Sequence, residues 1–240
     1  RMNELTSVQN FSEFSASGDL RAALRAIGRE FHSRRWSLGT SSNYSVVTGR
    51  NPLELLITAS GKDKSALTDD DFVAVDSAGQ LLPSHDVNGR KSSAETLLHC
   101  VIAQSRPDVG AILHTHSLWG TTLSREALKP QQTEGVIRIE GYEMLKGLEG
   151  ITTHDTAVDI PVFRNSQDMV ELSAQIKEAL FTPDESQPET LPPHGFLLSG
   201  HGLYTWGQTL AEARRHIEIF EFLFEVTAHQ RLFERVAEAQ

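Results

Sequence analysis

The sequence predicts a single α/β domain with a central, largely antiparallel sheet and helices on both of its faces. The chain has 240 residues, enough for one large domain with its own core, and no change in composition divides it. Short apolar runs typical of strands and hairpins alternate with segments of helical spacing. The sequence contains no internal repeat or heptad array that would indicate another architecture.

The first third of the chain is expected to form a helix followed by a hairpin. Apolar residues recur at helical spacing over residues 19–36, and Ser17 is a suitable N-cap for this helix. Residues 44–47 and 53–58 are apolar runs on either side of a turn, which predicts two hairpin strands. Residues 71–76 are expected to add a short strand.

The remainder of the chain is expected to alternate between helices and strands. Helices are predicted over residues 93–104, from about 118 onward, over 169–180 and over 209–228. Strands are predicted over residues 109–113, 135–139 and 157–163, and from 195 to a Gly-His-Gly segment. Residues 182–193 are rich in proline and acidic residues and are expected to form an exposed loop. The last helix carries more aromatic side chains than one core face needs, namely Phe220, Phe222 and Phe224, which indicates a contact between subunits.

Composition excludes several classes of function. The formal net charge of -10 argues against a nucleic-acid partner, although a local site can still bind an anionic substrate. No apolar run has the ~20 residues of a membrane span, and no signal peptide is visible. The single cysteine, Cys100, cannot form an intrachain disulfide, which fits a cytoplasmic protein. Arg1 precedes Met2 and is interpreted as a non-native addition.

Two strand ends carry histidines that can bind a metal. If the apolar run before His114 is a strand, His114 and His116 point to the same face. Far downstream, His201 follows another apolar run and lies between Gly200 and Gly202. Three imidazoles with an open position match a catalytic zinc site, whereas a His-x-His pair taken alone is also common at surfaces and in cores. The other seven histidines, His99 among them, are expected to be structural or surface groups.

His114-Thr115-His116 together with Gly200-His201-Gly202 resembles the class II aldolase/adducin family. The resemblance extends from about residue 18 to about 228. It implies a three-layer α/β/α fold, a ring-shaped homotetramer, and one divalent metal per chain held by His114, His116 and His201. Zinc is the metal that the family leads us to expect, although imidazole ligands alone do not fix the metal.

Two glutamates are candidates for proton transfer. Glu95 follows Ser92 in a Ser-x-x-Glu pattern, which by itself predicts a helix capping box. In the family's sugar-phosphate aldolases, the glutamate at this position lies at the metal and acts as a base, so both roles stay open. The segment from Gly141 to Gly147 resembles the dehydratase branch of the family, which implies an acid/base role for Glu143; without the resemblance, Glu143 would be an ordinary surface carboxylate.

Hydroxyl- and glycine-rich loops are expected to bind a phosphate group. Such loops present amides and hydroxyls to an anion, although any one of them can equally be a turn or a cap. Three of them together match the family's phosphate-binding segments. The expected contacts are Thr40, Ser41, Asn43, Ser60, Gly61, Lys62, Ser92 and Ser93. Related aldolases usually have glycine where Ser42 stands, which is the one departure in these loops.

The resemblance implies a metal-dependent dehydratase whose substrate is a phosphorylated methylthio-ketopentose. A proton would leave the carbon beside the carbonyl, and the neighbouring hydroxyl would leave as water. One alternative is a sugar-phosphate aldolase or epimerase on the same scaffold, which shares the metal and the phosphate loops. Another is an adducin-like interaction module without catalysis, which the three intact histidines argue against. A metal analysis would separate the enzymes from such a module.

Overall fold

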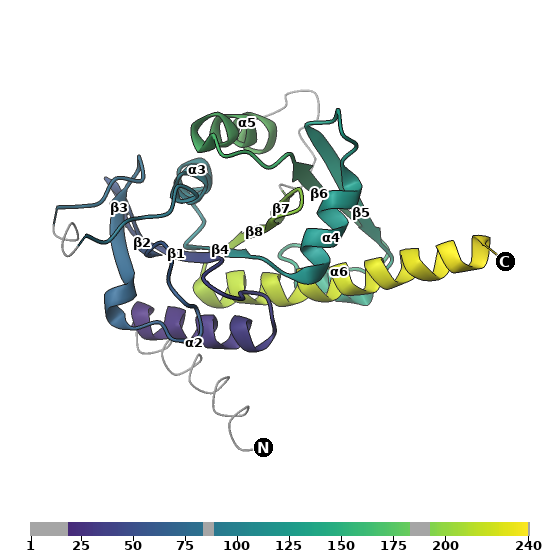
Figure 1. Cartoon of the computed structure of the whole chain (residues 1–240), viewed down its shortest axis with the longest axis horizontal. Helices are drawn as coiled ribbons and strands as arrows, with labels where there is room; N and C mark the ends of the chain where they lie inside the picture. The colour runs from purple at the N-terminus through teal and green to yellow at the C-terminus, as the bar shows by residue number, and fades with distance from the viewer. Residues whose placement is uncertain (1–18, 84–88, 183–192, 240) are drawn as a thin grey trace, which may run out of the picture.

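The computed structural model describes residues 19–83, 89–182 and 193–239, and in this part of the chain eight strands form one sheet between two layers of helices (Figure 1). The strands run in the order β3-β2-β1-β4-β8-β7-β6-β5. Their bounds are β1 Asn43–Arg50, β2 Leu53–Thr58, β3 Phe72–Asp76, β4 Ala111–Thr115, β5 Glu134–Glu140, β6 Ala157–Phe163, β7 Gly195–Leu198 and β8 Gly202–Gly207. Among these strands β6 and β7 pair in parallel, and the other neighbours are antiparallel. The predicted three-layer fold with a largely antiparallel sheet is therefore confirmed.

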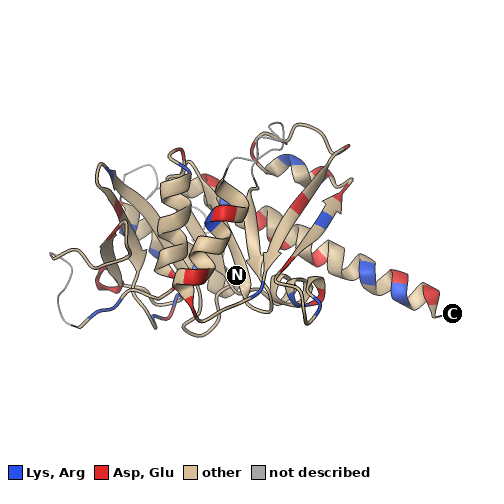
Figure 2. Cartoon of the chain, turned by 90° about the horizontal axis from the view of Figure 1, so that it is seen from above, with Lys and Arg blue, Asp and Glu red and all other residues tan. Residues whose placement is uncertain are grey.

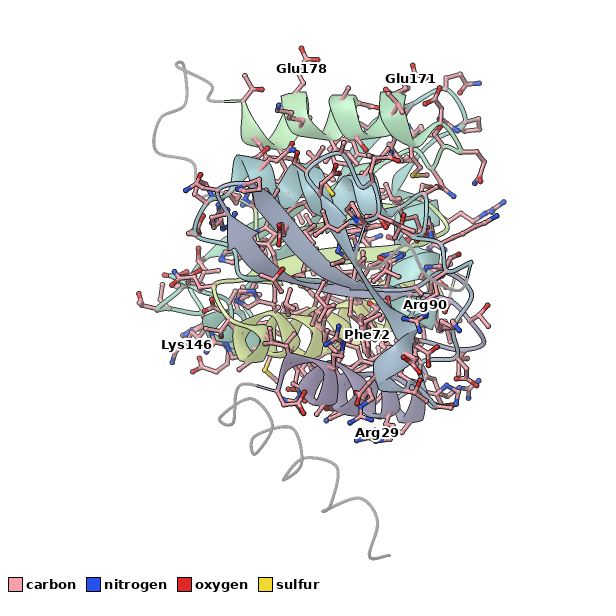
Figure 3. The ribbon with its side chains drawn as sticks, turned by 90° about the vertical axis from the view of Figure 1, so that its left-hand side faces the viewer. Arg29, Phe72, Arg90, Lys146, Glu171 and Glu178 are labelled. Carbon is pink, nitrogen blue, oxygen red and sulfur yellow. The ribbon has the colours of Figure 1, made fainter. Side chains whose placement is uncertain are left out.

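The helices divide between the two faces of the sheet. The α-helices are α2 Leu20–Ser33, α3 Thr96–Ser105, α4 Leu118–Ala127, α5 Met169–Phe181 and α6 Leu210–Glu238, and the 3-10 helices are η1 Asp69–Asp71 and η2 Glu143–Gly147. In Figure 1, α3 and α5 lie above the sheet, and α2 and α6 lie below it. Figure 3 shows the same layers from the side. Each face has its own hydrophobic core, one with side chains from α2, α4 and α6 and the other with side chains from α3 and α5.

Strand alternation decides which side chains of β4 face α3. Ala111 and Leu113 belong to the core between the sheet and helices α2 and α6. Ile112 belongs to the core between the sheet and helices α3 and α5. Because successive side chains of a strand point to opposite faces, His114 lies on the α3 face. Its ring stacks on Tyr204, which belongs to the same core, with centroids 3.9 Å apart. The fold therefore brings the first predicted metal ligand to the face that α3 covers.

The structure differs from the predicted elements at a few boundaries. Helix α2 is capped by Asp19, whose side chain accepts a hydrogen bond from the amide of Ala22; the predicted cap, Ser17, lies outside the described residues. Most of the predicted loop 182–193 also lies outside them. Strand β8 was not predicted, and α6 continues to Glu238 instead of ending at residue 228. No helix in the described ranges is long and apolar enough to cross a membrane.

Candidate metal centre and active site

Three histidine Nε2 atoms meet beyond the end of β4. His114 is the penultimate residue of β4, His116 follows the strand, and His201 lies in the turn between β7 and β8. The Nε2 atom of His116 lies 2.7 Å from that of His114 and 3.0 Å from that of His201. The sequence prediction that the three side chains converge is therefore reproduced in the geometry.

Hydrogen bonds fix which ring nitrogen faces the centre. The Nδ1 atom of His114 lies 2.8 Å from the carbonyl oxygen of Leu203, which can only accept, so Nδ1 carries the proton. The Nδ1 atom of His201 lies 3.3 Å from Oδ1 of Asn165. The His114 ring therefore presents the lone pair of Nε2 to the histidine cluster, and the contact with Asn165 orients the His201 ring so that its Nε2 atom also faces the cluster.

Burial keeps the buried histidines in their neutral form. Burial and the nearby charge of His201 lower the pKa of His116 to about 4. Burial also lowers the pKa of His114 well below its ordinary value. Neutral imidazole is the form that binds a metal, so these two side chains are available as ligands at neutral pH.

Glu95 completes a four-residue donor set. Its Oε1 atom lies 3.0 Å from Nε2 of His201, and its Oε2 atom lies 3.9 Å from Nε2 of His114. Burial acts to raise the pKa of Glu95, but its contacts with His201, His114 and Asn43 outweigh burial and hold this pKa below its usual range. One donor atom from each of Glu95, His114, His116 and His201 lies within 4.8 Å of the others. Three imidazoles and a carboxylate fit a first-row divalent ion such as zinc.

The structure does not show the capping box that the spacing of Ser92 and Glu95 predicted. Glu95 is the N-cap residue of α3, but its side chain makes no capping hydrogen bond. Instead its backbone amide donates to Oγ of Ser93, and the carboxylate is left for the histidines. Helix α3 begins at Thr96, three residues later than the Ser-x-x-Glu spacing predicted, and the Glu95 side chain contacts the histidines instead of the helix start.

Asn43 connects Glu95 to a buried polar chain. The Nδ2 atom of Asn43 donates to Oε2 of Glu95 at 2.6 Å. The Oδ1 atom of Asn43 lies 2.5 Å from Nε2 of His99, and Nδ1 of His99 lies 2.7 Å from Oγ of Ser45. Sequence reasoning assigned Asn43 to the phosphate and left His99 without a function; the only signal was the position of His99 one helical turn after Glu95.

A pocket of about 290 Å³ opens beside the histidines and Glu95. It is lined mainly by small and hydroxyl-bearing side chains of the loops before β1, after β2 and before α3. Six of the predicted phosphate contacts line it: Thr40, Ser41, Asn43, Ser60, Gly61 and Ser93. Ser42 and Thr58, which belong to the same predicted loops, also line it. Gln167 and Met169 line it too and were not predicted, because they come from the distant start of α5.

The other two predicted phosphate contacts lie elsewhere. Lys62 forms an ion pair with Asp71 at 2.8 Å, and Ser92 donates a hydrogen bond to the carbonyl oxygen of Gly79. Neither residue lines the pocket. A nearer positive charge is the buried Lys64, whose Nζ atom donates to the carbonyl oxygen of Lys62. Burial lowers the pKa of Lys64 to about 8, and its charge acts on both Glu95 and His116.

Ser42, where the family resemblance led us to expect glycine, has a backbone conformation that glycine adopts readily. Ser42 has φ 73, in the left-handed region that favours glycine. Gly61, in the facing loop, has φ 71. Ser42 therefore keeps the loop shape that glycine would give. Compared with glycine, it only adds a side chain to the lining of the pocket.

The chain does not bring its own Glu143 to the histidines. Strand β5 is antiparallel to β6, β6 is parallel to β7, and both β7 and β4 are antiparallel to β8. Consequently β5 runs opposite to β4, and η2, which follows β5, lies at the other end of the sheet from His114. The Glu143 side chain is 71% exposed and lies 2.6 Å from Nζ of Lys146 and 3.4 Å from Nδ1 of His154. In Figure 3, Lys146 of η2 lies on the opposite side of the molecule from Arg90, which precedes α3.

The sequence matches known proteins over most of its length. Residues 22–228 match the family Class II Aldolase and Adducin N-terminal domain. The chain is 46% identical over 198 residues to a methylthioribulose-1-phosphate dehydratase of Pseudomonas fluorescens, covering 82% of this chain and 86% of the relative. A protein of the same name from Picosynechococcus is 40% identical over 207 residues, covering 86% and 90% of the two chains.

Solved structures share the fold at low sequence identity. The L-fuculose-1-phosphate aldolase of Thermus thermophilus superposes with a TM-score of 0.66 at 22% identity, covering 90% of this chain and 97% of that one. A sugar-phosphate aldolase of Thermotoga maritima superposes with a TM-score of 0.57 at 19% identity, covering 85% and 91%. At such identities these similarities establish the architecture only.

Proposed function

The chain belongs to the class II aldolase and adducin family, and on this premise we propose that it is a metal-dependent dehydratase of 5-methylthioribulose 1-phosphate. The product is 2,3-diketo-5-methylthiopentyl 1-phosphate, an intermediate of methionine salvage. The observation that carries the proposal is the intact His₃–Glu donor set beside a hydroxyl-lined pocket. We assign the reaction, a carbon–oxygen lyase reaction, to the cytoplasm.

We assign one Zn²⁺ per chain to His114, His116 and His201, with Glu95 beside it. A divalent ion there supplies Lewis-acid stabilisation of negative charge at the substrate oxygens. The orientation of the rings by Leu203 and Asn165 supports this ligand set. Glu95 adds a negative charge that partly offsets the charge of the ion.

The phosphate group is assigned to the loops around Thr40, Ser41, Ser60, Gly61 and Ser93. The left-handed backbone of Gly61 and the hydroxyls of the serines suit an anion held by neutral donors. The buried Lys64 provides a positive potential without lining the pocket. Binding the phosphate group, which takes no part in the reaction, orients the substrate and supplies binding energy for the chemical step.

The dehydration requires one proton to leave C3 and one hydroxide to leave C4. A carboxylate that takes the C3 proton leaves an electron pair, which forms the C3–C4 double bond as the C4–O bond breaks. The departing hydroxide takes up a proton and becomes water, and the enol then tautomerises to the diketone. We assign the proton transfers to Glu143, with Glu95 as the group that lies at the ion.

Glu143 can serve this site only if another copy of the chain supplies it. Its own sheet holds it at the far end from His114, so the acid/base would be Glu143 of the partner subunit. We therefore propose a homotetramer with the active site at a subunit boundary. Phe220 and Phe224 are fully buried in the core, so the aromatic surplus of α6 reduces to the half-exposed Phe222.

The end of α6 provides a stronger reason for a subunit contact. It extends beyond the sheet in Figure 1, and Figure 2 shows charged residues of both signs along it. Leu232, Phe233 and Val236 are exposed on these last turns, with Phe233 at 75%. Exposed large apolar side chains grouped on one element are typical of an interaction surface.

The direct test is incubation of the purified protein with 5-methylthioribulose 1-phosphate, followed by mass spectrometry. A product lighter by one water, absent after metal chelation, is the expected result. Two smaller carbon fragments would indicate a retro-aldol enzyme on the same scaffold. An isomer of unchanged mass would indicate an epimerase, and a protein without stoichiometric metal or activity would indicate a non-catalytic interaction module.

A further inference from the structure

Glu95 is held against the histidines by a chain of buried side chains, two of which, His99 and Ser45, lie outside the pocket wall. We propose that His99 and Ser45 are positioning residues, which act through Asn43 to fix the Glu95 carboxylate; this inference rests on the metal site of the proposed function. His99 and Ser45 are completely buried, and Asn43 is 3% exposed. All three hydrogen bonds of the chain measure 2.5–2.7 Å.

The direction of each hydrogen bond follows from the one before it. The Glu95 carboxylate only accepts, so Asn43 must turn its amide nitrogen toward it and its Oδ1 atom toward His99. The Nε2 atom of His99 must then donate to Oδ1, which leaves Nδ1 to accept from the hydroxyl of Ser45. In this arrangement the hydroxyl of Ser45 stabilises the His99 tautomer that donates to Asn43, and His99 stabilises the Asn43 orientation that donates to Glu95.

The reversed amide would be costly at this position. It would place Oδ1 of Asn43 against the negatively charged carboxylate and its NH₂ group against the NH of His99. Buried polar groups that lack hydrogen-bond partners destabilise the arrangement that contains them. The chain therefore keeps the donor of Asn43 on Glu95, which lies 3.0 Å from His201 and 3.9 Å from His114.

Packing alone gives no reason for a histidine at position 99. Its neighbours in α3 that face the same core, Leu98 and Ile102, are aliphatic. A buried imidazole is disfavoured unless both nitrogens are hydrogen-bonded, whereas a leucine would meet no such requirement. Burial lowers the pKa of His99 to about 3, so the ring stays neutral, which its acceptor role toward Ser45 requires.

The test uses Co²⁺-loaded protein, because the visible absorption of Co²⁺ reports the ligands around the ion without any substrate. In His99→Leu we expect the absorption bands to shift toward those of Glu95→Gln, and kcat to fall ~10–100-fold with little change in KM. His99→Gln, which restores an NH donor toward Asn43, should recover part of both signals. Ser45→Ala should shift the absorption bands in the same direction, but by a smaller amount. If His99→Leu fails to fold, the spectrum of Ser45→Ala is the measurement that tests the inference.

The matched control is His216→Leu. His216 is also a buried histidine with both nitrogens hydrogen-bonded, to the carbonyl of Trp206 and to the amide of Glu149. Its bonds have no link to Glu95, so its variant should keep the wild-type Co²⁺ spectrum.

A double variant decides whether His99 acts through Glu95. In a Glu95→Gln background, His99→Leu should add no further change to the spectrum or to kcat. A full additional loss there, or an unchanged spectrum in His99→Leu itself, would overturn the inference. Co²⁺ spectra that shift as expected in a protein without dehydratase activity would support the positioning role and overturn the proposed reaction. A wild-type protein that takes up no Co²⁺ would overturn both.

Discussion

Asn43 and His114 lie directly opposite each other in the antiparallel pairing of β1 and β4. The same pair of strands therefore supplies one ring to the histidine cluster and the amide that donates to Glu95. Because strand pairing fixes this geometry, the donor set is built on the rigid part of the fold, and the pocket loops extend from it.

Removing one imidazole should remove most of the metal. We expect His201→Ala to retain far less than one divalent ion per chain after gel filtration, because a three-histidine site has no spare ligand. Elemental analysis of the purified protein measures this. The control is His229→Ala, an exposed histidine on α6 that contacts Trp119. Wild-type metal content in His201→Ala would remove His201 from the site.

Two adjacent serines offer a matched test of the phosphate site. Ser93→Asp places a negative charge in the pocket against a phosphate dianion, and we expect KM to rise about tenfold or more. Aspartate can still accept the hydrogen bond that the amide of Glu95 donates to Ser93, so the helix start should persist. Ser92→Asp adds the same charge outside the pocket and should change KM much less. Equal effects of the two substitutions would place the phosphate elsewhere.

Glu221 should make stability depend on pH. It is 3% exposed beneath β4, and burial raises its pKa from 4.5 to about 7 despite hydrogen bonds from Ser117 and Thr115. Between these pH values the unfolded chain has lost the proton and the folded chain keeps it, so stability falls as pH rises from about 4.5 to 7. Glu221→Gln stays neutral throughout. We expect it to unfold like wild type at pH 4.5 and to gain about 2–4 kcal/mol relative to wild type at pH 8.

Urea unfolding at a fixed protein concentration measures this difference, because the stability of an oligomer depends on concentration. Exposed Glu178→Gln on α5 serves as the control for the loss of one carboxylate. A constant gap between Glu221→Gln and wild type from pH 4.5 to 8 would mean that Glu221 is ionised in the folded protein.

The histidine cluster could be predicted from sequence because local rules determine it. Alternation along β4 places His114 and His116 on one face, and Gly200, with φ 67, lets the chain turn back tightly at His201. The spacing alone left the role of Glu95 open, because a capping glutamate and a metal-side glutamate share it, and only the family resemblance placed Glu95 at the metal. The role of His99 could not be predicted, because its hydrogen bonds to Ser45 and Asn43 are formed only in the folded chain.

Strand β8 was missed because its signals depend on tertiary structure. A Cβ atom at Gly202 would collide with the carbonyl oxygen of Thr115, so glycine permits the close pairing of β8 with β4. In sequence, this glycine indicates only a loop around His201. The position of Glu143 is likewise a property of strand order, which periodicity does not contain.

The exposed end of α6 should contribute to assembly. We expect wild-type protein to be a tetramer by light scattering, and Phe233→Asp to shift it toward smaller species, because the charge would replace an apolar contact. Val170→Asp is the control, since Val170 is equally exposed but lies on α5. A wild-type monomer at micromolar concentration would contradict the proposed subunit boundary.

Replacing the proposed acid/base should stop turnover without disturbing the metal. Glutamine is nearly isosteric with Glu143 but cannot accept the C3 proton, so Glu143→Gln should lower kcat by ~10²–10⁴-fold. Metal content should stay at the wild-type level, because Glu143 does not belong to the donor set of the metal site. Glu95→Gln serves for comparison. If it loses turnover and Glu143→Gln does not, the site works with Glu95 as its base.

Co-expression of two inactive chains tests whether Glu143 acts across a subunit boundary. His201→Ala lacks the metal site but keeps Glu143, whereas Glu143→Gln keeps the metal site. If each active site combines two chains, roughly a quarter of the sites in randomly mixed oligomers are complete, because each needs two independent intact halves. Turnover should then return to a corresponding fraction of the wild-type rate. If Glu143 instead acted within its own chain, mixing would restore nothing, and the sheet topology would have to rearrange to bring η2 to β4.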